Sequence, residues 1–285
     1  MRIDRARERQ NVLAAALDSG LTHFDTAPIY GFGEAERSLG VFLARQRGRV
    51  TLATKFGLRP SRLATRLVPL QRVARQTLRA FPLLRGAAVR GSGALYSQPD
   101  FSIDSVRTGL DASLRALRTD HVDFFLAHQA SESALPPEEL IDLLERLRAG
   151  GKIGDFGVAT EFNWLGPVLQ QRPRLNRVVQ FDSELTTANV SALGAPLGRL
   201  LITYGFITRT IATCRERLRD ADLAGLEDET LGGLVLRAAV LANPTGLTLM
   251  QSRSPARIAR NVGAATTAAH DEMVERLAQI LGTRC

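Results

Sequence analysis

"HFDTAPIYGFGEAERSLG", residues 23–40, is the stretch of sequence that decides the fold. The residues that lead to Asp25 predict a short strand, and the amphipathic pattern beyond the loop predicts a helix over 34–46. Pro28, Gly31 and Gly33, which lie between the predicted strand and the predicted helix, are typical turn residues. The stretch is therefore one strand–loop–helix unit. Asp25 at the end of the strand and Tyr30 in the loop do not belong to ordinary core packing, which marks this unit as a candidate for chemistry.

The alternation of short apolar runs with longer amphipathic segments continues along the chain. Strands are predicted at about 21–25, 50–54, 122–127, 153–158, 177–181, 200–204 and 246–249. Helices are predicted at 5–18, 34–46, 104–117, 137–149, 161–170, 229–241 and, with breaks, 255–280. Strands that alternate with helices indicate right-handed crossovers and a parallel sheet.

These elements predict an α/β protein that folds as a (β/α)8 TIM barrel, in a single domain over residues 1–285. The length suits such a barrel, which typically needs about 250 residues. No change of composition divides the chain, although a doubly wound sheet stays open as the structural alternative. The sequence begins with the helix "RARERQNVLAAALDSG", where a barrel first supplies a strand. Seven strands are therefore predicted, and the barrel is expected to be incomplete on its N-terminal side.

The composition is that of an ordinary globular protein, with 45% hydrophobic and 23% charged residues. No apolar run of about 18 residues predicts a membrane span, and "MRIDRARERQ" lacks the apolar centre of a signal peptide. The two cysteines, Cys214 and Cys285, have neither metal-binding nor disulfide spacing. We therefore expect a cytoplasmic protein without a metal site.

The formal net charge of +8 is concentrated in one Arg-rich insertion, at about 57–103. This insertion holds eight arginines and one acid, Asp100, whereas the rest of the chain is nearly neutral. Because it leaves from a strand end, it is interpreted either as a basic lid or wall that favours anionic substrates, or as an exposed decoration. A role in binding membranes or nucleic acids is disfavoured, because no nucleic-acid motif or aromatic platform accompanies it.

Four polar residues follow strands that a barrel brings to one rim, namely Asp25, Tyr30, Lys55 and His128. Together they can deliver a proton. A carbonyl group that takes a hydride on carbon needs a proton on oxygen. The Lys55 ammonium, kept charged by Asp25, would make the Tyr30 phenol a stronger acid. His128 would polarise and position the carbonyl oxygen.

Four segments carry a resemblance to a known family: "GLTHFDTAPIYGFGEAERSLG", "VTLATKFG", "VDFFLAHQ" and "GKIGDFGVAT". They resemble the successive signatures of the aldo-keto reductase superfamily, over about residues 7–265 and most weakly at 58–103 and 205–230. The resemblance implies a (β/α)8 barrel that binds NADP(H) and reduces aldehydes or ketones. It implies Tyr30 as the catalytic acid, supported by the other three rim residues, and a small-molecule carbonyl or alcohol substrate.

The resemblance also implies cofactor-binding positions. Tyr204 matches the aromatic residue that stacks on nicotinamide, and Gln180 and Thr160 match the partners of its carboxamide group. The segment "QSRSPARIARN" resembles the part of the family that binds the phosphate on the adenine ribose. Its matching residues are Ser252, Arg253, Ser254, Arg257 and Asn261. Hydroxyl groups, guanidinium groups and a helix N-terminus suit a phosphate, so we expect NADPH to be preferred over NADH.

Several positions depart from the family's pattern. Ala159 and Thr160 stand where Ser-Asn is usual, Gln251 replaces a common lysine, and Arg260 replaces the acid before Asn261. The family's N-terminal hairpin and first barrel strand have no counterpart in the sequence. These departures keep open a second hypothesis, a degenerate barrel that acts as a binding or scaffold subunit without catalysis. A third is a sugar dehydrogenase that runs the same reaction toward oxidation.

Overall fold

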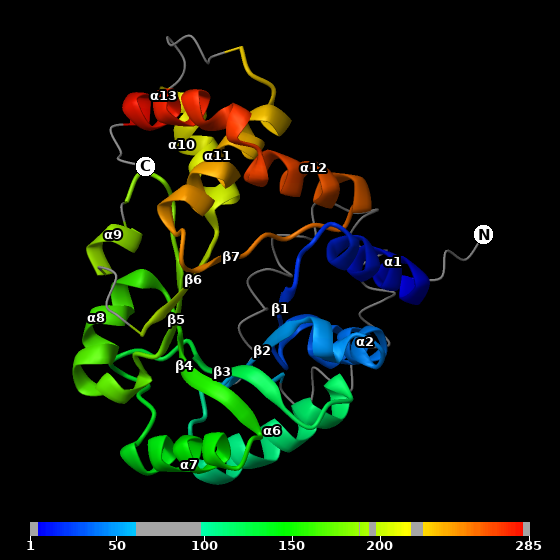
Figure 1. The fold of residues 1–285 in the computed structure, drawn as a ribbon. Coiled ribbons are helices and arrows are strands. Elements are labelled where there is room, and N and C mark those ends of the chain that lie inside the picture. Colours follow the sequence, from blue (N-terminus) through cyan, green and yellow to red (C-terminus); the bar gives the residue numbers. More distant parts are fainter. Residues whose placement is uncertain (1–4, 61–97, 188, 194–197, 218–224, 282–285) are drawn as a thin grey trace, which may run out of the picture. The chain divides into compact units, whose positions relative to one another are not determined.

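The computed structural model describes residues 5–60, 98–187, 189–193, 198–217 and 225–281. In these residues seven strands form one parallel sheet, and each strand lies beside its successor in the chain (Figure 1). The strands are β1 (His23–Asp25), β2 (Thr51–Phe56), β3 (Val122–His128), β4 (Ile153–Ala159), β5 (Val178–Asp182), β6 (Leu200–Tyr204) and β7 (Leu247–Thr248). The predicted α/β class and sequential parallel sheet are confirmed.

Helices connect the strands, and most were predicted from the sequence. They are α1 (Arg5–Asp18), α2 (Glu34–Leu43), α6 (Ile103–Leu117), α7 (Glu138–Ala149), α8 (Phe162–Gln171), α9 (Asn189–Leu193), α10 (Phe206–Arg217), α11 (Asp228–Ala242), α12 (Pro255–Thr266) and α13 (Asp271–Leu281). The helix predicted at 34–46 was too long, because it ends at Leu43 and a 3-10 turn follows at Arg47–Arg49. Helices α9 and α10 were not predicted. None of the described helices is both long and apolar enough to traverse a lipid bilayer.

The chain groups into two compact units. The first, here called the catalytic-candidate unit, is His23–Phe156, and the second, the cofactor-candidate unit, combines Met1–Thr22 with Gly157–Cys285. The boundary falls inside β4. The single domain stays a prediction, and most of the predicted Arg-rich insertion, residues 61–97, lies outside the described residues.

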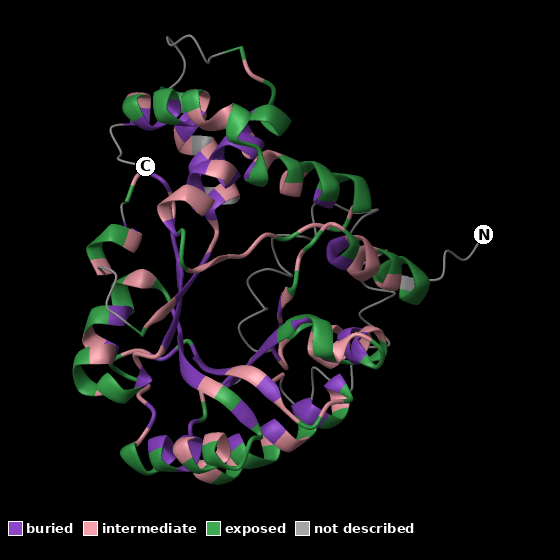
Figure 2. Cartoon of the chain, in the orientation of Figure 1, coloured by how far each residue is buried: buried purple, intermediate pink, exposed green. Residues whose placement is uncertain are grey.

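The core of the catalytic-candidate unit forms around β2. After its first residue every side chain of this strand is buried, as expected for a parallel strand covered on both faces. The ring of Phe56 packs against Phe125, with 4.6 Å between centroids, and against Phe101 at 5.9 Å. Helices α6 and α7 turn apolar residues inward and leave their outer residues exposed (Figure 2). This packing holds the carboxyl end of β2 in a fixed position.

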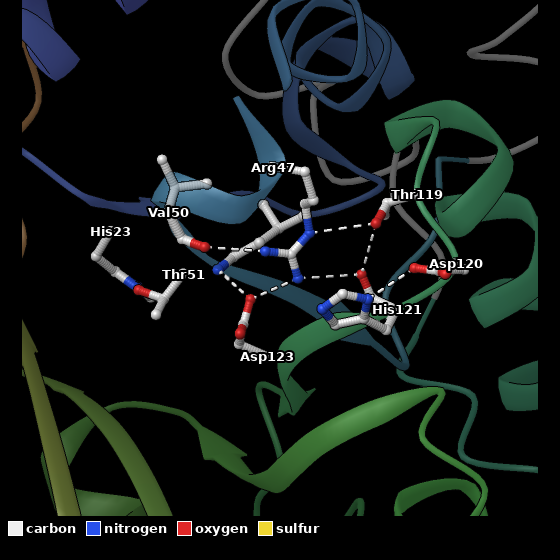
Figure 3. Close-up of polar contacts among 9 residues, drawn as sticks. His23, Arg47, Val50, Thr51, Thr119, Asp120, His121 and Asp123 are labelled. Atoms are coloured by element: carbon white, nitrogen blue, oxygen red, sulfur yellow. Dashed lines mark hydrogen bonds and ion pairs between the residues drawn. The ribbon is translucent and has the colours of Figure 1, made fainter. Parts of the chain in front are cut away.

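Arg47, in the turn before β2, joins the beginnings of β2 and β3 (Figure 3). Its guanidinium group donates to the Asp123 carboxylate at 2.6 Å, to Thr119 Oγ1 at 3.2 Å and to the His121 carbonyl at 3.3 Å. The backbone amide of Leu52 donates to the same Asp123 oxygen at 2.8 Å. The cluster lies at the amino ends of the strands. In barrels that end contributes to stability rather than to catalysis, so we interpret the cluster as structural.

In the cofactor-candidate unit, strand β5 is buried along its whole length. Helices α10, α11 and α13 pack around an apolar cluster that also includes a residue after β5. Its buried members are Leu185, Phe206, Cys214, Leu231, Leu234, Val235, Ala238, Ala239, Val274, Leu277 and Leu281. Burial raises the pKa of the Cys214 thiol to about 11, so this cysteine packs as an apolar group and is not a nucleophile.

Candidate active site

The buried ion pair between Lys55 and Asp25 is the centre of the candidate site. Lys55 Nζ lies 2.6 Å from Asp25 Oδ2, and the two side chains are only 2% and 12% exposed. The same ammonium donates to the Thr26 carbonyl at 3.0 Å. Strand register explains why the two side chains meet. Asp25 ends β1 opposite Ala53, and Lys55, two residues after Ala53, points to the same face of the sheet.

Tyr30 lies beside this pair, on a 3-10 turn between β1 and α2. Residues 31, 32 and 33 all have positive φ, at 58°, 58° and 84°. Glycine adopts such angles without cost, and Gly31 and Gly33 therefore let the chain bend sharply after the tyrosine. The Tyr30 side chain is 38% exposed, and its ring centroid lies 5.0 Å from Lys55 Nζ. The phenol is thus open to a ligand while its ring adjoins a buried positive charge.

His128 ends β3, and its ring lies beside that of Tyr30. The two rings meet edge to face, with centroids 6.0 Å apart and an interplanar angle of 87°. The His128 side chain is buried, and burial together with the charge of Lys55 lowers its pKa to about 3. Its Nδ1 has no hydrogen-bond partner among the described residues. The imidazole is therefore neutral at neutral pH, and a neutral imidazole carries a proton on one of its two ring nitrogens.

The structure therefore brings all four residues predicted for catalysis together in one unit. Their types suit proton transfer to or from an oxygen atom, because the ring of an exposed tyrosine adjoins both an ammonium group and a neutral imidazole. Among the described residues, no cluster of His, Cys, Asp and Glu side chains could hold a metal ion.

A shallow groove of about 570 Å³ lies between the segment that leads into α6 and the loop after β3. No charged side chain belongs to its described lining, which consists of Gln98, Pro99, Phe101, Ser102, Ser133, Ala134, Leu135 and Pro137. Phe101 also packs on Phe56, which directly follows Lys55. The groove therefore adjoins loops at the carboxyl ends of β2 and β3, and its mixture of apolar surface and hydroxyl groups suits an uncharged molecule.

Three of the predicted cofactor residues lie on or directly after neighbouring strands of the cofactor-candidate unit: Thr160 follows β4, Gln180 is the third residue of β5 and Tyr204 ends β6. Thr160 and Gln180 are 3% and 2% exposed, and the Thr160 amide donates to the Gln180 carbonyl at 3.0 Å. Tyr204 ends β6 opposite Asp182 and is partly exposed. Thr160 and Tyr204 thus lie at the carboxyl ends of their strands, and Gln180 neighbours Thr160 on the adjacent strand. The carboxyl ends of the strands are where ligands bind in α/β proteins.

The predicted phosphate segment forms the N-terminus of α12. Ser254 is the N-cap residue, and its Oγ accepts from the backbone amide of Arg257 at 3.4 Å. Ser252 Oγ accepts from the Ser254 amide at 3.2 Å, which folds the segment back over the helix end. Arg253 and Arg257 are exposed, and Asn261 is partly exposed one turn further on. Two guanidinium groups at a helix N-terminus make a favourable environment for a phosphate.

Sequence reasoning missed two residues of these sites. Asp182 Oδ1 accepts from the backbone amide of Phe162 at 2.7 Å and so fixes the start of α8, just after Thr160. Glu36 is only 4% exposed although it is an acid. A signal for Glu36 was present, because it shares the apolar face of α2 with the residues three and seven positions later.

Comparisons with known proteins identify a family and a fold that the chain shares. The model of the aldo/keto reductase family matches residues 4–165. A 6-dehydroglucose reductase of Agrobacterium fabrum is 29% identical over 180 residues, which are 62% of this chain and 51% of the relative. A pyridoxal 4-dehydrogenase of Microbacterium luteolum is 29% identical over 159 residues, 52% of this chain and 44% of the relative. The matched part thus spans about half the length of these curated relatives.

Solved structures share the fold at lower identity. An aldo-keto reductase from Bacillus halodurans in its holo form superposes with a TM-score of 0.69 and 19% identity, over 94% of this chain and 86% of that one. An aldo-keto reductase from Klebsiella pneumoniae in complex with NADPH gives a TM-score of 0.64 and 20% identity, over 98% and 86%. Because the family model covers more than half of the sequence, the chain belongs to the aldo/keto reductase family. The predicted fold, a (β/α)8 barrel with seven strands recognised, is confirmed.

Proposed function

We propose that this protein is an NADPH-dependent oxidoreductase that interconverts an aldehyde or ketone with its alcohol, with Tyr30 as the proton donor for reduction. One observation carries the proposal: the exposed Tyr30 ring lies 5.0 Å from the ammonium of Lys55, which is itself buried and paired with Asp25. Membership of the aldo/keto reductase family supports the reaction class. The direction of the reaction in the cell belongs to the same proposal, since the same residues serve both directions.

The proposed mechanism follows from the charges around the phenol. NADPH supplies the hydride when it is bound. Tyr30 donates its phenolic proton to the substrate oxygen as negative charge develops there. Lys55 stabilises the phenolate that remains, and Asp25 holds the ammonium in place through their contact of 2.6 Å. His128, neutral because of its burial, donates a hydrogen bond to the same substrate oxygen and orients the carbonyl group.

The cofactor is proposed to bind in the cofactor-candidate unit. The chemistry of the residues there fits NADPH, since buried amide and hydroxyl groups at Gln180 and Thr160 suit a carboxamide. Tyr204 offers a partly exposed ring for stacking. The N-terminus of α12, with the exposed groups of Arg253 and Arg257, suits the phosphate on the adenine ribose. Ser252, Ser254 and Asn261 complete the proposed set.

Substitution of Tyr30 by Phe tests the proposed proton donor. Because the variant keeps the ring but loses the phenolic proton, hydride transfer should slow by about 10²–10⁴-fold or more. NADPH affinity should stay near that of the wild type. Single-turnover oxidation of NADPH and fluorescence titration measure the two quantities separately. A variant that keeps most of its single-turnover rate would end this mechanism. A wild-type protein that binds no nicotinamide cofactor would instead favour the scaffold hypothesis.

Substitution of Arg257 by Ala tests the proposed phosphate site. Loss of one charge-assisted contact should cost about 1.5–3 kcal/mol of binding, so the Kd for NADPH should rise by about 10- to 100-fold. The Kd for NADH should barely change, because NADH lacks that phosphate. Arg260→Ala is the matched control, since this arginine lies on the same helix and pairs with Glu229. Equal effects of the two substitutions on NADPH affinity would show that the phosphate binds elsewhere.

An anionic substrate is proposed from the Arg-rich insertion alone, and the uncharged groove supports the competing idea of a neutral substrate. Neutralising Arg59, Arg62 and Arg66 together should raise the KM of anionic carbonyl compounds more than that of neutral ones, and added salt should shrink the difference. Equal changes in the KM values of anionic and neutral substrates would show that the insertion is an exposed decoration and does not contact the substrate.

A further inference from the structure

Glu36 is a buried acid that the proposed mechanism does not use. Its carboxylate accepts a hydrogen bond of 2.7 Å from Thr54 Oγ1, and both side chains are buried, at 4% and 0% exposure. Burial raises the pKa of Glu36, whereas hydrogen bonds from Thr54 and from Ser113 on α6 oppose this rise. Three elements, α2, β2 and α6, therefore converge on one carboxyl group. Burying a carboxyl group costs folding free energy. The presence of Glu36 where three elements pack together therefore needs an explanation.

The reason suggested by the structure is the position of Glu36 between two catalytic segments. Helix α2 begins at Glu34, directly after the 3-10 turn that starts at Tyr30. Thr54 directly precedes Lys55, and successive residues of a strand point to opposite faces. Lys55 thus contacts Asp25 on one face of β2 while Thr54 contacts Glu36 on the other. The Thr54–Glu36 hydrogen bond therefore links the helix that follows the tyrosine to the strand that carries the lysine.

The surrounding packing limits how α2 can move. An added Cβ at Gly40, one turn after Glu36, would lie 2.2 Å from the carbonyl oxygen of Ala116 on α6. The two helices are therefore in backbone contact and cannot approach more closely. Only three residues separate Tyr30 from α2, and all three have left-handed backbone angles. A rotation or slide of α2 along α6 would consequently carry Tyr30 with it.

We propose that Glu36 is a positioning residue, whose bond to Thr54 sets the position of the Tyr30 phenol relative to Lys55. This inference rests on the proposed function, in which the position of the Tyr30 phenol relative to Lys55 governs proton transfer. A misplacement of about 1 Å at reacting groups can cost about 10²-fold in rate. Glu36→Ala and Thr54→Val should therefore lower the single-turnover rate of hydride transfer by about 10- to 10²-fold. The Kd for NADPH should not change, because neither Glu36 nor Thr54 is among the residues proposed to bind the cofactor.

Conservative variants and a matched control separate positioning from stability. Glu36→Gln keeps an oxygen that accepts from Thr54, and Thr54→Ser keeps the donor, so each should restore most of the rate. Leu144→Ala removes a fully buried side chain from α7 in the same unit. It should lower Tm to a similar degree as Glu36→Ala but leave the rate unchanged. If Glu36→Ala does not fold, the comparison of Thr54→Val with Thr54→Ser still decides the question.

A second measurement needs no catalysis. The sequence contains three tyrosines, so the NMR signal of ¹³C-labelled Tyr30 can be assigned with Tyr30→Phe. We expect this signal to move in Glu36→Ala and Thr54→Val and to stay in place in Glu36→Gln and Leu144→Ala. Wild-type rate and signal position in both Glu36→Ala and Thr54→Val would overturn the inference. An inactive wild type would overturn the proposed function, whereas the NMR signal alone would then decide the role of Glu36.

Discussion

Replacing Asp25 by Asn removes the only charge that contacts the buried Lys55 ammonium among the described residues. At the observed separation of 2.6 Å, the attraction between the two charges is on the order of 6 kcal/mol for an effective dielectric constant of ~20. Desolvation of both groups offsets much of this attraction. Removing one partner of a buried pair nevertheless costs about 3–5 kcal/mol, because the other charge stays buried and unpaired. The asparagine oxygen can still accept one hydrogen bond, so we expect a loss of about 3 kcal/mol.

Urea denaturation at pH 7, followed by circular dichroism, measures this loss. The matched control is Asp111→Asn, which breaks the pair that Asp111 forms with Lys152, the other lysine of the chain, at 3.3 Å. Those two side chains are about half exposed, so the control should cost less than about 1 kcal/mol. The double variant Asp25→Asn/Lys55→Met should recover part of the lost stability, because no unpaired charge remains buried. Equal losses for Asp25→Asn and Asp111→Asn would refute the reasoning.

Two further predictions concern stability. Burial lowers the pKa of His128 from 6.5 to about 3. Below pH 6.5 the unfolded chain therefore binds a proton at this histidine that the folded chain does not bind. The free energy of unfolding should accordingly be unaffected by protonation of His128 above pH 6.5 and fall as the pH decreases toward 3. His128→Asn should therefore flatten the acid side of the stability–pH curve from urea titrations, and parallel curves would contradict this expectation. Gly40→Ala should cost about 1–3 kcal/mol, since its Cβ would lie 2.2 Å from the Ala116 oxygen; an unchanged Tm would show that the helices are less closely packed.

The sequence was most informative at the strands. Their ends were predicted to within about two residues, because short apolar runs between turn residues identify parallel strands well. The four catalytic candidates followed from this, since parallel strands bring their carboxyl ends to one edge. The bend after Tyr30 was also foreseeable, because Gly31 and Gly33 supply the positive φ angles that the turn requires.

Helix α10 shows where the sequence was less informative. Its sequence, "FITRTIATCRER", is rich in β-branched residues, which favour strands over helices. Its buried residues Phe206, Thr210 and Cys214 nevertheless recur every four positions, as on one face of a helix. Tertiary packing against α11 and α13 therefore decides the helical state, and local propensity alone does not.

Glu36 shows a different limit of reasoning from strand ends. Looking for polar residues at the carboxyl ends of strands identifies side chains that can contact a ligand. It does not identify residues such as Glu36, which contact the other face of the sheet from a helix. The Glu36–Thr54 contact lies on the helix-facing side of β2, opposite the contact between Lys55 and Asp25. Replacing a buried polar pair by well-packed apolar residues is often neutral or stabilising, so stability alone gives little reason for a carboxylate there. A directional bond has a property that apolar packing lacks, because it fixes one distance and one angle between α2 and β2. The acid at position 36 is therefore better explained by the geometry it imposes on Tyr30 and Lys55 than by the stability it contributes.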